Sequence, residues 1–73
     1  MNKAVKELKS LPQRLYKLRT ANNFTQGDVA LRIGISYQSY QAYEYGKAIP
    51  TLKNFIKIAN FYGVSLDFLI GKN

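Results

Sequence analysis

The chain has 73 residues, enough for one small domain with a single hydrophobic core and one binding surface. Its formal net charge of +7, without histidine, favours an anionic partner: nucleic acid, an acidic protein or an anionic membrane surface. The absence of cysteine excludes a disulfide framework and a thiolate metal site. We expect a cytoplasmic protein, because the sequence shows neither a signal peptide nor an apolar run long enough to span a membrane.

Catalysis is the function class with the least support. The four acidic residues lie on different predicted elements and show no carboxylate-pair or metal-ligand spacing. We therefore predict no enzyme activity, no metal site and no cofactor. The acidic residues are Glu7, Asp28, Glu44 and Asp67.

Residues 1–10 have two interpretations. Lys3, Lys6 and Lys9 form a basic stripe, whereas the apolar residues between them follow helical spacing. We expect either a loose basic arm or a short leading helix, followed by the domain proper in residues 11–73.

The first helix of the domain is predicted over Leu11–Ala21. Ser10 stands at the N-cap position and Gln13 three residues later, while Pro12 lies in the first turn, where its missing N–H costs nothing. The inward stripe of this helix is expected to contain Leu11, Leu15 and Leu18.

Two short helical patterns, over residues 26–33 and 37–45, form the centre of the sequence. Only three residues separate them, so the two helices must cross at a steep angle, as in a helix-turn-helix unit. Thr25 and Ser36 stand at the two N-cap positions, and Asp28 completes an imperfect capping box with Thr25.

The second of these helices has two chemically different faces. Tyr40 and Tyr43 lie three residues apart and are expected to point inward. The opposite face is polar and aromatic and carries no charge, and it contains Tyr37, Gln38, Gln41, Ala42 and Tyr45. Glutamine can bind the adenine edge bidentately and alanine can contact a thymine methyl. These residue types alone also suit an ordinary solvated helix face, and it is the surrounding helix-turn-helix motif that favours a base-reading surface.

A turn over residues 46–50 precedes a fourth helix at 52–62, capped by Thr51, and a fifth at 66–70, capped by Ser65. No alternating strand pattern appears, so the sequence predicts an all-α fold of five helices. The buried stripe of the fourth helix is expected to contain Leu52, Phe55, Ile56, Ala59 and Tyr62.

Phe61 and Phe68 fall outside the predicted inward stripes. They are either half-buried at the edge of the core or exposed as an apolar patch through which two copies form a homodimer.

Residues 11–71 resemble the phage repressor and Cro type of helix-turn-helix domain, which is also called xenobiotic-response-element-like. The resemblance rests on short motifs in a specific order: Arg14-Leu15, Thr25-Gln26, Ala30, Gly34-Ile35-Ser36, Glu44-x-Gly46, Ile49-Pro50-Thr51-Leu52, Ile58-Ala59 and Gly63-Val64-Ser65-Leu66 with Leu69.

This resemblance implies a five-helix lambda-repressor-like domain that inserts its third helix into the DNA major groove, usually as a two-fold dimer on a pseudo-palindromic operator. It implies base contacts from Tyr37, Gln38, Gln41 and Ala42. It also implies phosphate contacts from Gln26, Ser39, Tyr45, Lys47, Thr51 and Lys53. Arg19 and Glu44 match a partly buried structural ion pair of the family.

Two departures from the family pattern concern tyrosines. Tyr40 and Tyr43 replace aliphatic residues, so each inward ring needs a partner for its hydroxyl. Tyr37 replaces a commoner short polar or basic residue at a position of base contact.

The sequence therefore predicts a sequence-specific, double-stranded DNA-binding transcriptional regulator, with repression as the expected activity. The alternative is a protein-interaction module, such as an antitoxin or adaptor, that uses the same fold on a protein partner.

Overall fold

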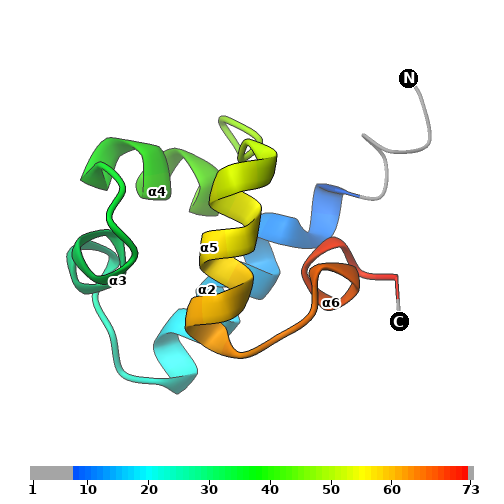
Figure 1. Ribbon diagram of the computed structural model, residues 1–73, viewed down its shortest axis with the longest axis horizontal. Helices are drawn as coiled ribbons and strands as arrows, with labels where there is room; N and C mark the ends of the chain where they lie inside the picture. The colour runs from blue at the N-terminus through cyan, green and yellow to red at the C-terminus, as the bar shows by residue number, and fades with distance from the viewer. Residues whose placement is uncertain (1–7, 73) are drawn as a thin grey trace.

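The computed structural model of the protein describes residues 8–72, and residues 1–7 and 73 lie outside that part. The described chain forms one short 3-10 helix and five α-helices without a strand, which confirms the predicted all-α fold (Figure 1). Most of the predicted N-terminal arm lies outside the described residues. The elements are η1 Leu8–Ser10, α2 Leu11–Ala21, α3 Gln26–Ile33, α4 Tyr37–Glu44, α5 Leu52–Tyr62 and α6 Leu66–Ile70.

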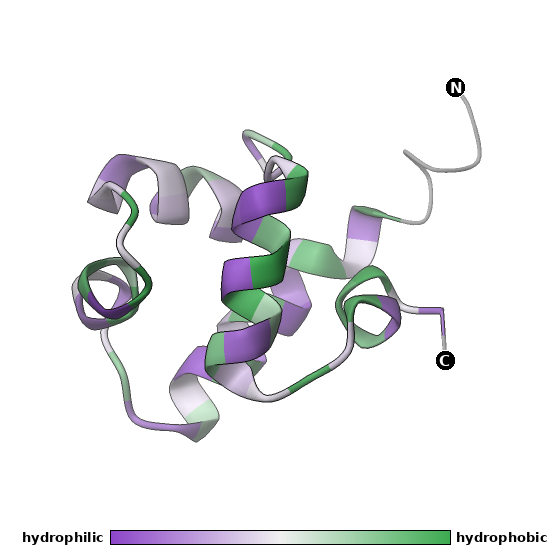
Figure 2. Cartoon of the chain, viewed as in Figure 1, coloured by the Kyte–Doolittle hydropathy of each residue, from purple (hydrophilic) through white to green (hydrophobic). Residues whose placement is uncertain are grey.

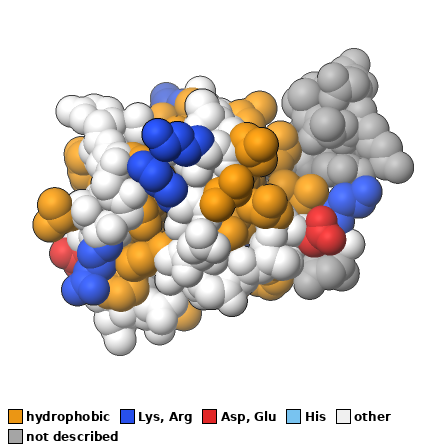
Figure 3. Space-filling model, viewed as in Figure 1, with side chains coloured by type: hydrophobic (Ala, Val, Ile, Leu, Met, Phe, Trp, Pro, Cys, Tyr) orange, Lys and Arg blue, Asp and Glu red, His pale blue; other side chains and the backbone are white. Residues whose placement is uncertain are grey.

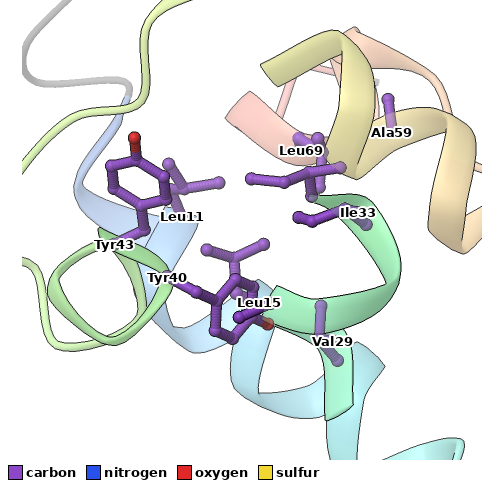
Figure 4. Close-up of a cluster of buried hydrophobic side chains, with 10 residues drawn as sticks. Leu11, Leu15, Val29, Ile33, Tyr40, Tyr43, Ala59 and Leu69 are labelled. Atoms are coloured by element: carbon purple, nitrogen blue, oxygen red, sulfur yellow. The ribbon is translucent and has the colours of Figure 1, made fainter. Parts of the chain in front are cut away.

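The core lies where all five α-helices meet. Each helix contributes one large side chain with no exposed surface: Leu15, Val29, Tyr40, Ile58 and Leu69. Figure 4 shows this cluster, with the Tyr40 ring beside the Leu15 side chain and Leu69 approaching from α6. In Figure 1, α5 crosses in front of α2, with α3 and α4 on one side and α6 on the other. Because α2 and α3 both pack on α4, the inner side of α4 is held in place by its neighbours.

Local capping fixes where α3 and α4 begin. The Thr25 hydroxyl accepts from the Asp28 N–H at 3.0 Å, and the Asp28 carboxylate accepts from the Thr25 N–H at 2.9 Å, which completes the capping box. The Ser36 hydroxyl accepts from the Ser39 N–H at 3.0 Å in the same way. Gly34 ends α3 in the left-handed region, with φ of 76°, so the chain can turn into α4 after two more residues.

The predicted cap of α2 is wrong. Ser10 has helical backbone angles, with φ of −86° and ψ of −6°, and its side chain makes no capping hydrogen bond. The reason is that η1 runs directly into α2, so Ser10 does not adopt the extended conformation that an N-cap requires. Its hydroxyl instead accepts from Arg14 Nε at 3.3 Å.

The predicted inward stripe of α5 is also partly wrong. Leu52 and Ile56 are 69% and 44% exposed, whereas Ile58, which the stripe omitted, is completely buried. Ala59 is buried as expected. Figure 2 shows hydrophobic residues on several sides of α5, so helical periodicity alone could not identify the side that faces the core.

The two inward tyrosines of α4 both find hydroxyl partners on α5. Tyr40 and Tyr43 are buried as predicted. The hydroxyl of Tyr40 lies 2.8 Å from that of Tyr62, and Asn54 Nδ2 donates to the Tyr43 hydroxyl at 2.9 Å. Burial raises the pKa of both Tyr40 and Tyr62 above the usual value for tyrosine, because a phenolate would lose its hydration.

Phe61 and Phe68 are half-buried, which favours the first of their two interpretations. The Phe61 ring centroid lies 5.4 Å from that of Phe24, and the Arg14 guanidinium stands over the Phe68 ring at 5.3 Å. Both rings therefore have partners within the chain.

Candidate nucleic-acid interface

The face of α4 opposite Tyr40 and Tyr43 lies on the surface. Gln38 is exposed, and Gln41 and Ala42 are half-buried. The Ser36 cap and the two buried tyrosine rings set the rotation of α4, so this polar face points away from the core. The arrangement makes the predicted reading face accessible, while contacts of its residues with DNA stay a prediction.

The expected ion pair between Arg19 and Glu44 is present beneath one end of this face. Arg19 Nη2 lies 2.7 Å from Glu44 Oε1, and Arg19 Nε donates to Oε2 at 2.9 Å. The Glu44 side chain is 2% exposed, and the hydrogen bond to it raises the pKa of Arg19. Because Arg19 Nη1 also donates to the Phe24 carbonyl at 2.9 Å, the pair ties α2, the chain before α3 and the end of α4 together.

A chain of amide hydrogen bonds leads from this ion pair to the surface of α4. Gln26 Nε2 donates to Glu44 Oε1 at 3.2 Å, and Gln41 Nε2 donates to Gln26 Oε1 at 3.3 Å. The same Gln41 nitrogen donates to the Tyr37 hydroxyl at 2.9 Å. The sequence placed these residues individually but missed this network, which depends on the crossing of α3 and α4. Its only sequence signal is the four-residue spacing of Tyr37 and Gln41.

An open hollow of about 540 Å³ lies between the start of α3 and the two ends of α4. The N–H groups of Gln26 and Gly27 belong to the first turn of α3, and no backbone carbonyl accepts a hydrogen bond from them. The start of a helix carries a partial positive charge, so these groups suit an anion such as a phosphate. The hollow is lined by Tyr16, Arg19, Phe24, Thr25, Gln26, Gly27, Tyr37, Glu44 and Tyr45.

The remaining predicted phosphate contacts differ in how freely they can bind. Lys47, in the turn after α4, and Lys53, in the first turn of α5, are exposed cations. The hydroxyls of Thr51 and Ser39 already accept hydrogen bonds, from the Asn54 N–H at 3.2 Å and the Ser36 hydroxyl at 2.8 Å. Each of these two hydroxyls still has its proton to donate to a phosphate.

A family model described as helix-turn-helix matches residues 15–69. The chain belongs to this helix-turn-helix family. The match runs from the middle of α2 to the penultimate residue of α6, so it includes the whole helix-turn-helix unit and most of the helices that support it.

Several transcriptional regulators resemble the chain. The cryptic phage CTXphi transcriptional repressor RstR of Vibrio cholerae is 44% identical over 62 residues, 85% of this chain and 55% of the repressor. The SPbeta prophage-derived uncharacterized HTH-type transcriptional regulator YonR of Bacillus subtilis is 47% identical over 58 residues, 80% and 54% of the two chains. An uncharacterized HTH-type transcriptional regulator of Methanocaldococcus jannaschii is 40% identical over 57 residues, 78% and 86% of the two.

The chain thus spans about half the length of RstR and YonR. No solved structure was found to match it. Within residues 8–72, no three side chains of the metal-binding types His, Cys, Asp and Glu gather in one place. In the same part of the chain, no helix combines the length and apolar character needed to cross a membrane.

Proposed function

We propose that the chain binds double-stranded DNA at a specific sequence and regulates transcription, most simply as a repressor. The observation that carries this proposal is the exposed amide-bearing face of α4, presented by a helix-turn-helix whose inner side is fully packed. The printed names of RstR and YonR, a transcriptional repressor and a transcriptional regulator, support it. Such a protein acts in the cytoplasm with the DNA and binds its ligand without catalysis.

In this proposal the outward face of α4 enters the major groove and the surrounding residues hold the two phosphate backbones. The base contacts are proposed for Tyr37, Gln38, Gln41 and Ala42. The phosphate contacts are proposed for Gln26, Ser39, Tyr45, Lys47, Thr51 and Lys53. The hollow at the start of α3 supports the role of Gln26, because a phosphate there would also meet the free N–H groups of the first turn.

Selection of binding sites from random duplex DNA tests the proposal and should return a motif. We expect Gln38→Ala to cost about 1–3 kcal/mol of discrimination at one base pair of that motif. Lys47→Ala should instead weaken binding to all sequences alike and lower the slope of log affinity against log salt by about one. Equal losses on the selected site and on random DNA for Gln38→Ala would contradict base reading.

We further propose that two copies bind as a homodimer on a pseudo-palindromic operator, as helix-turn-helix proteins commonly do. Phe61 and Phe68 are half-buried, so only part of each ring could contact a second copy. Leu52 and Ile56 lie one turn apart on α5 and are more exposed. Figure 3 shows hydrophobic side chains gathered over α5, with Lys or Arg side chains beside them. Analytical ultracentrifugation that finds one copy both free and on operator-length DNA would exclude the dimer.

One observation favours the alternative of a protein partner. The hollow at the start of α3 is surrounded by three exposed tyrosines, Tyr16, Tyr37 and Tyr45, a side chain enriched in protein interfaces. An interaction module should enrich no DNA motif in the same selection experiment, so one measurement separates the two functions.

A further inference from the structure

We infer that Glu44, acting through Gln26, fixes the orientation of the Gln41 amide, so that Gln41 offers a base only a hydrogen-bond acceptor. Gln41 would then select a base that carries an exocyclic amino group in the major groove. Glu44 and Gln26 are positioning residues in this scheme, and Gln41 contacts the base. The inference rests on the proposed binding of α4 in the major groove.

The orientation starts at the buried carboxylate of Glu44. This carboxylate forms the ion pair with Arg19 and, being ionised, can only accept hydrogen bonds. The part of the Gln26 amide that faces Glu44 must therefore be its NH₂ group, which lies 3.2 Å from Oε1. The carbonyl oxygen of Gln26 is consequently turned away from Glu44.

Gln26 passes this orientation on to Gln41. The Gln26 carbonyl can only accept, so Gln41 turns its own NH₂ group towards it, at 3.3 Å. The Tyr37 hydroxyl, at 2.9 Å, can either donate or accept and would tolerate both orientations of Gln41. A rotation of the Gln41 amide by half a turn would bring two carbonyl oxygens together, and Gln26 could relieve that contact only by facing Glu44 with its oxygen. Gln26 is therefore the residue that determines the orientation of the Gln41 amide.

The Gln41 carbonyl oxygen is what remains for DNA. Both amide hydrogens of Gln41 are engaged, one by Gln26 and one by Tyr37, while no side chain in residues 8–72 donates to Oε1. In the same residues no buried side-chain polar atom lacks a partner, so this unbonded oxygen must reach the surface. Tyr37 accepts from Gln41 and keeps its own proton to donate outward.

This arrangement changes what Gln41 can read. A freely rotating glutamine binds adenine bidentately, donating to N7 and accepting from N6. Held as an acceptor only, Gln41 can use the N6 amino group of adenine or the N4 amino group of cytosine equally well. At the major-groove edge, guanine presents the acceptors O6 and N7 and thymine presents the acceptor O4. These atoms would repel the Gln41 oxygen. The expected preference is thus for adenine or cytosine over guanine or thymine.

The test combines site selection with variants of the full chain. The base position read by Gln41 is the one whose preference disappears in Gln41→Ala. At that position the wild-type chain should favour adenine and cytosine by roughly 3- to 10-fold, the worth of one hydrogen bond. Gln26→Met, or Gln26→Ala if the methionine variant does not fold, frees the Gln41 amide to rotate and should reduce this preference to less than about twofold.

Gln38→Met is the matched control, because Gln38 is an exposed glutamine of the same helix outside the network. It should change another base position and leave the adenine or cytosine preference intact. A loss of phosphate contact in Gln26→Met would weaken all duplexes alike and would not alter that preference. A preference for guanine or thymine in the wild-type chain, or an unchanged preference in Gln26→Met, would overturn the inference.

A measurement on the free protein separates this inference from the proposed function. If no duplex is enriched, DNA binding itself is wrong. The network is then judged by NMR of the side-chain amides, in which the Gln41 hydrogens should exchange with water more slowly than those of Gln38. Gln26→Met should remove most of that difference. Equal exchange rates in the wild-type chain would show that the network does not hold Gln41.

Discussion

The two helices α4 and α5 are joined by side-chain hydrogen bonds and differ in how their outward faces are built. The outward face of α4 is polar, and its amides are bonded to one another and to the ion pair beneath them. The outward face of α5 exposes aliphatic side chains, Leu52 and Ile56, that contribute little to the core. The inward faces are linked through the hydroxyls of two tyrosines on α4.

This difference shows what determines the orientation of each helix. In α4 the sequence separates aromatic inward residues from amide-bearing outward ones, so one orientation satisfies both. In α5 apolar residues occupy several sides, and the orientation is set by which of them meets α3 and α6. Mutations on the outward face of α4 should therefore act through polar partners, whereas mutations of the aliphatic residues of α5 should follow their burial.

The largest effect is expected at Glu44, where α4 is anchored. Glu44→Ala leaves Arg19 without its partner at a site where both side chains are mostly covered, so it should lower the free energy of unfolding by about 3–5 kcal/mol. Urea denaturation followed by circular dichroism measures the loss. A double replacement of Arg19 and Glu44 by methionine and leucine should recover much of it, since no charge is then stranded. A loss below about 1 kcal/mol would show that the pair is effectively solvated.

On α5 a pair of isoleucines two residues apart gives the next largest contrast. Ile58→Ala should cost about 2–5 kcal/mol of unfolding free energy, because it opens a cavity in the buried cluster of the core. Ile56→Ala should stay within about 0.5 kcal/mol, because its side chain is already 44% exposed. Similar losses in both variants, at a concentration where the protein is monomeric, would contradict the observed orientation of α5.

Most of the fold could be predicted from the sequence, because the ends of α3, α4, α5 and α6 are encoded locally. Serine or threonine at each N-cap and glycine after α3, α5 and α6 require no knowledge of the tertiary structure. Ser10 was the exception, because η1 continues into α2 and keeps its backbone helical. The side of α5 that faces the core depends on its neighbours, which the sequence does not display.

The candidate site could likewise be predicted only in part from the sequence. The outward residues of α4 follow from helical spacing and from the resemblance, as does the pairing of Arg19 with Glu44. The link from Glu44 through Gln26 to Gln41 joins residues up to 18 positions apart, and only the crossing of α3 and α4 brings them within 3.3 Å. Residue types indicate what these side chains can bind, but not which of their atoms remain available.

The N-caps of α4 and α5 provide a smaller and nearly equal pair of effects. Ser36→Ala and Thr51→Ala should each cost about 1 kcal/mol of unfolding free energy, because each hydroxyl accepts a first-turn N–H that would otherwise lack a partner. Thermal and urea denaturation of both variants measure the costs. The corresponding Ser10→Ala change should cost less, because Ser10 caps nothing. If Ser10→Ala lost as much stability as the other two variants, the absence of a capping hydrogen bond at Ser10 would be contradicted.

The hydroxyl contact between α4 and α5 should give a similarly small effect at neutral pH and a distinctive one in alkali. Tyr40→Phe removes the 2.8 Å contact with Tyr62 and should cost about 1 kcal/mol of unfolding free energy at pH 7. The pKa values of Tyr40 and Tyr62 are raised in the folded chain, mainly by burial, whereas the unfolded chain ionises near the ordinary value of 10.0. Above pH 10 the unfolded state therefore releases protons that the folded state retains, so stability falls as pH rises.

Tyr40→Phe has one such group fewer, so its stability should fall less steeply in this range. The gap between wild-type chain and variant should accordingly narrow between pH 9 and 11 in urea denaturation, where lysine ionisation affects both proteins alike. Tyr16→Phe is the matched control for loss of a tyrosine hydroxyl, because Tyr16 is an exposed tyrosine of α2 and its replacement should leave the free energy of unfolding at pH 7 unchanged. A gap that stays constant would mean that Tyr40 ionises as easily folded as unfolded. Such a result would be incompatible with its burial between the two helices.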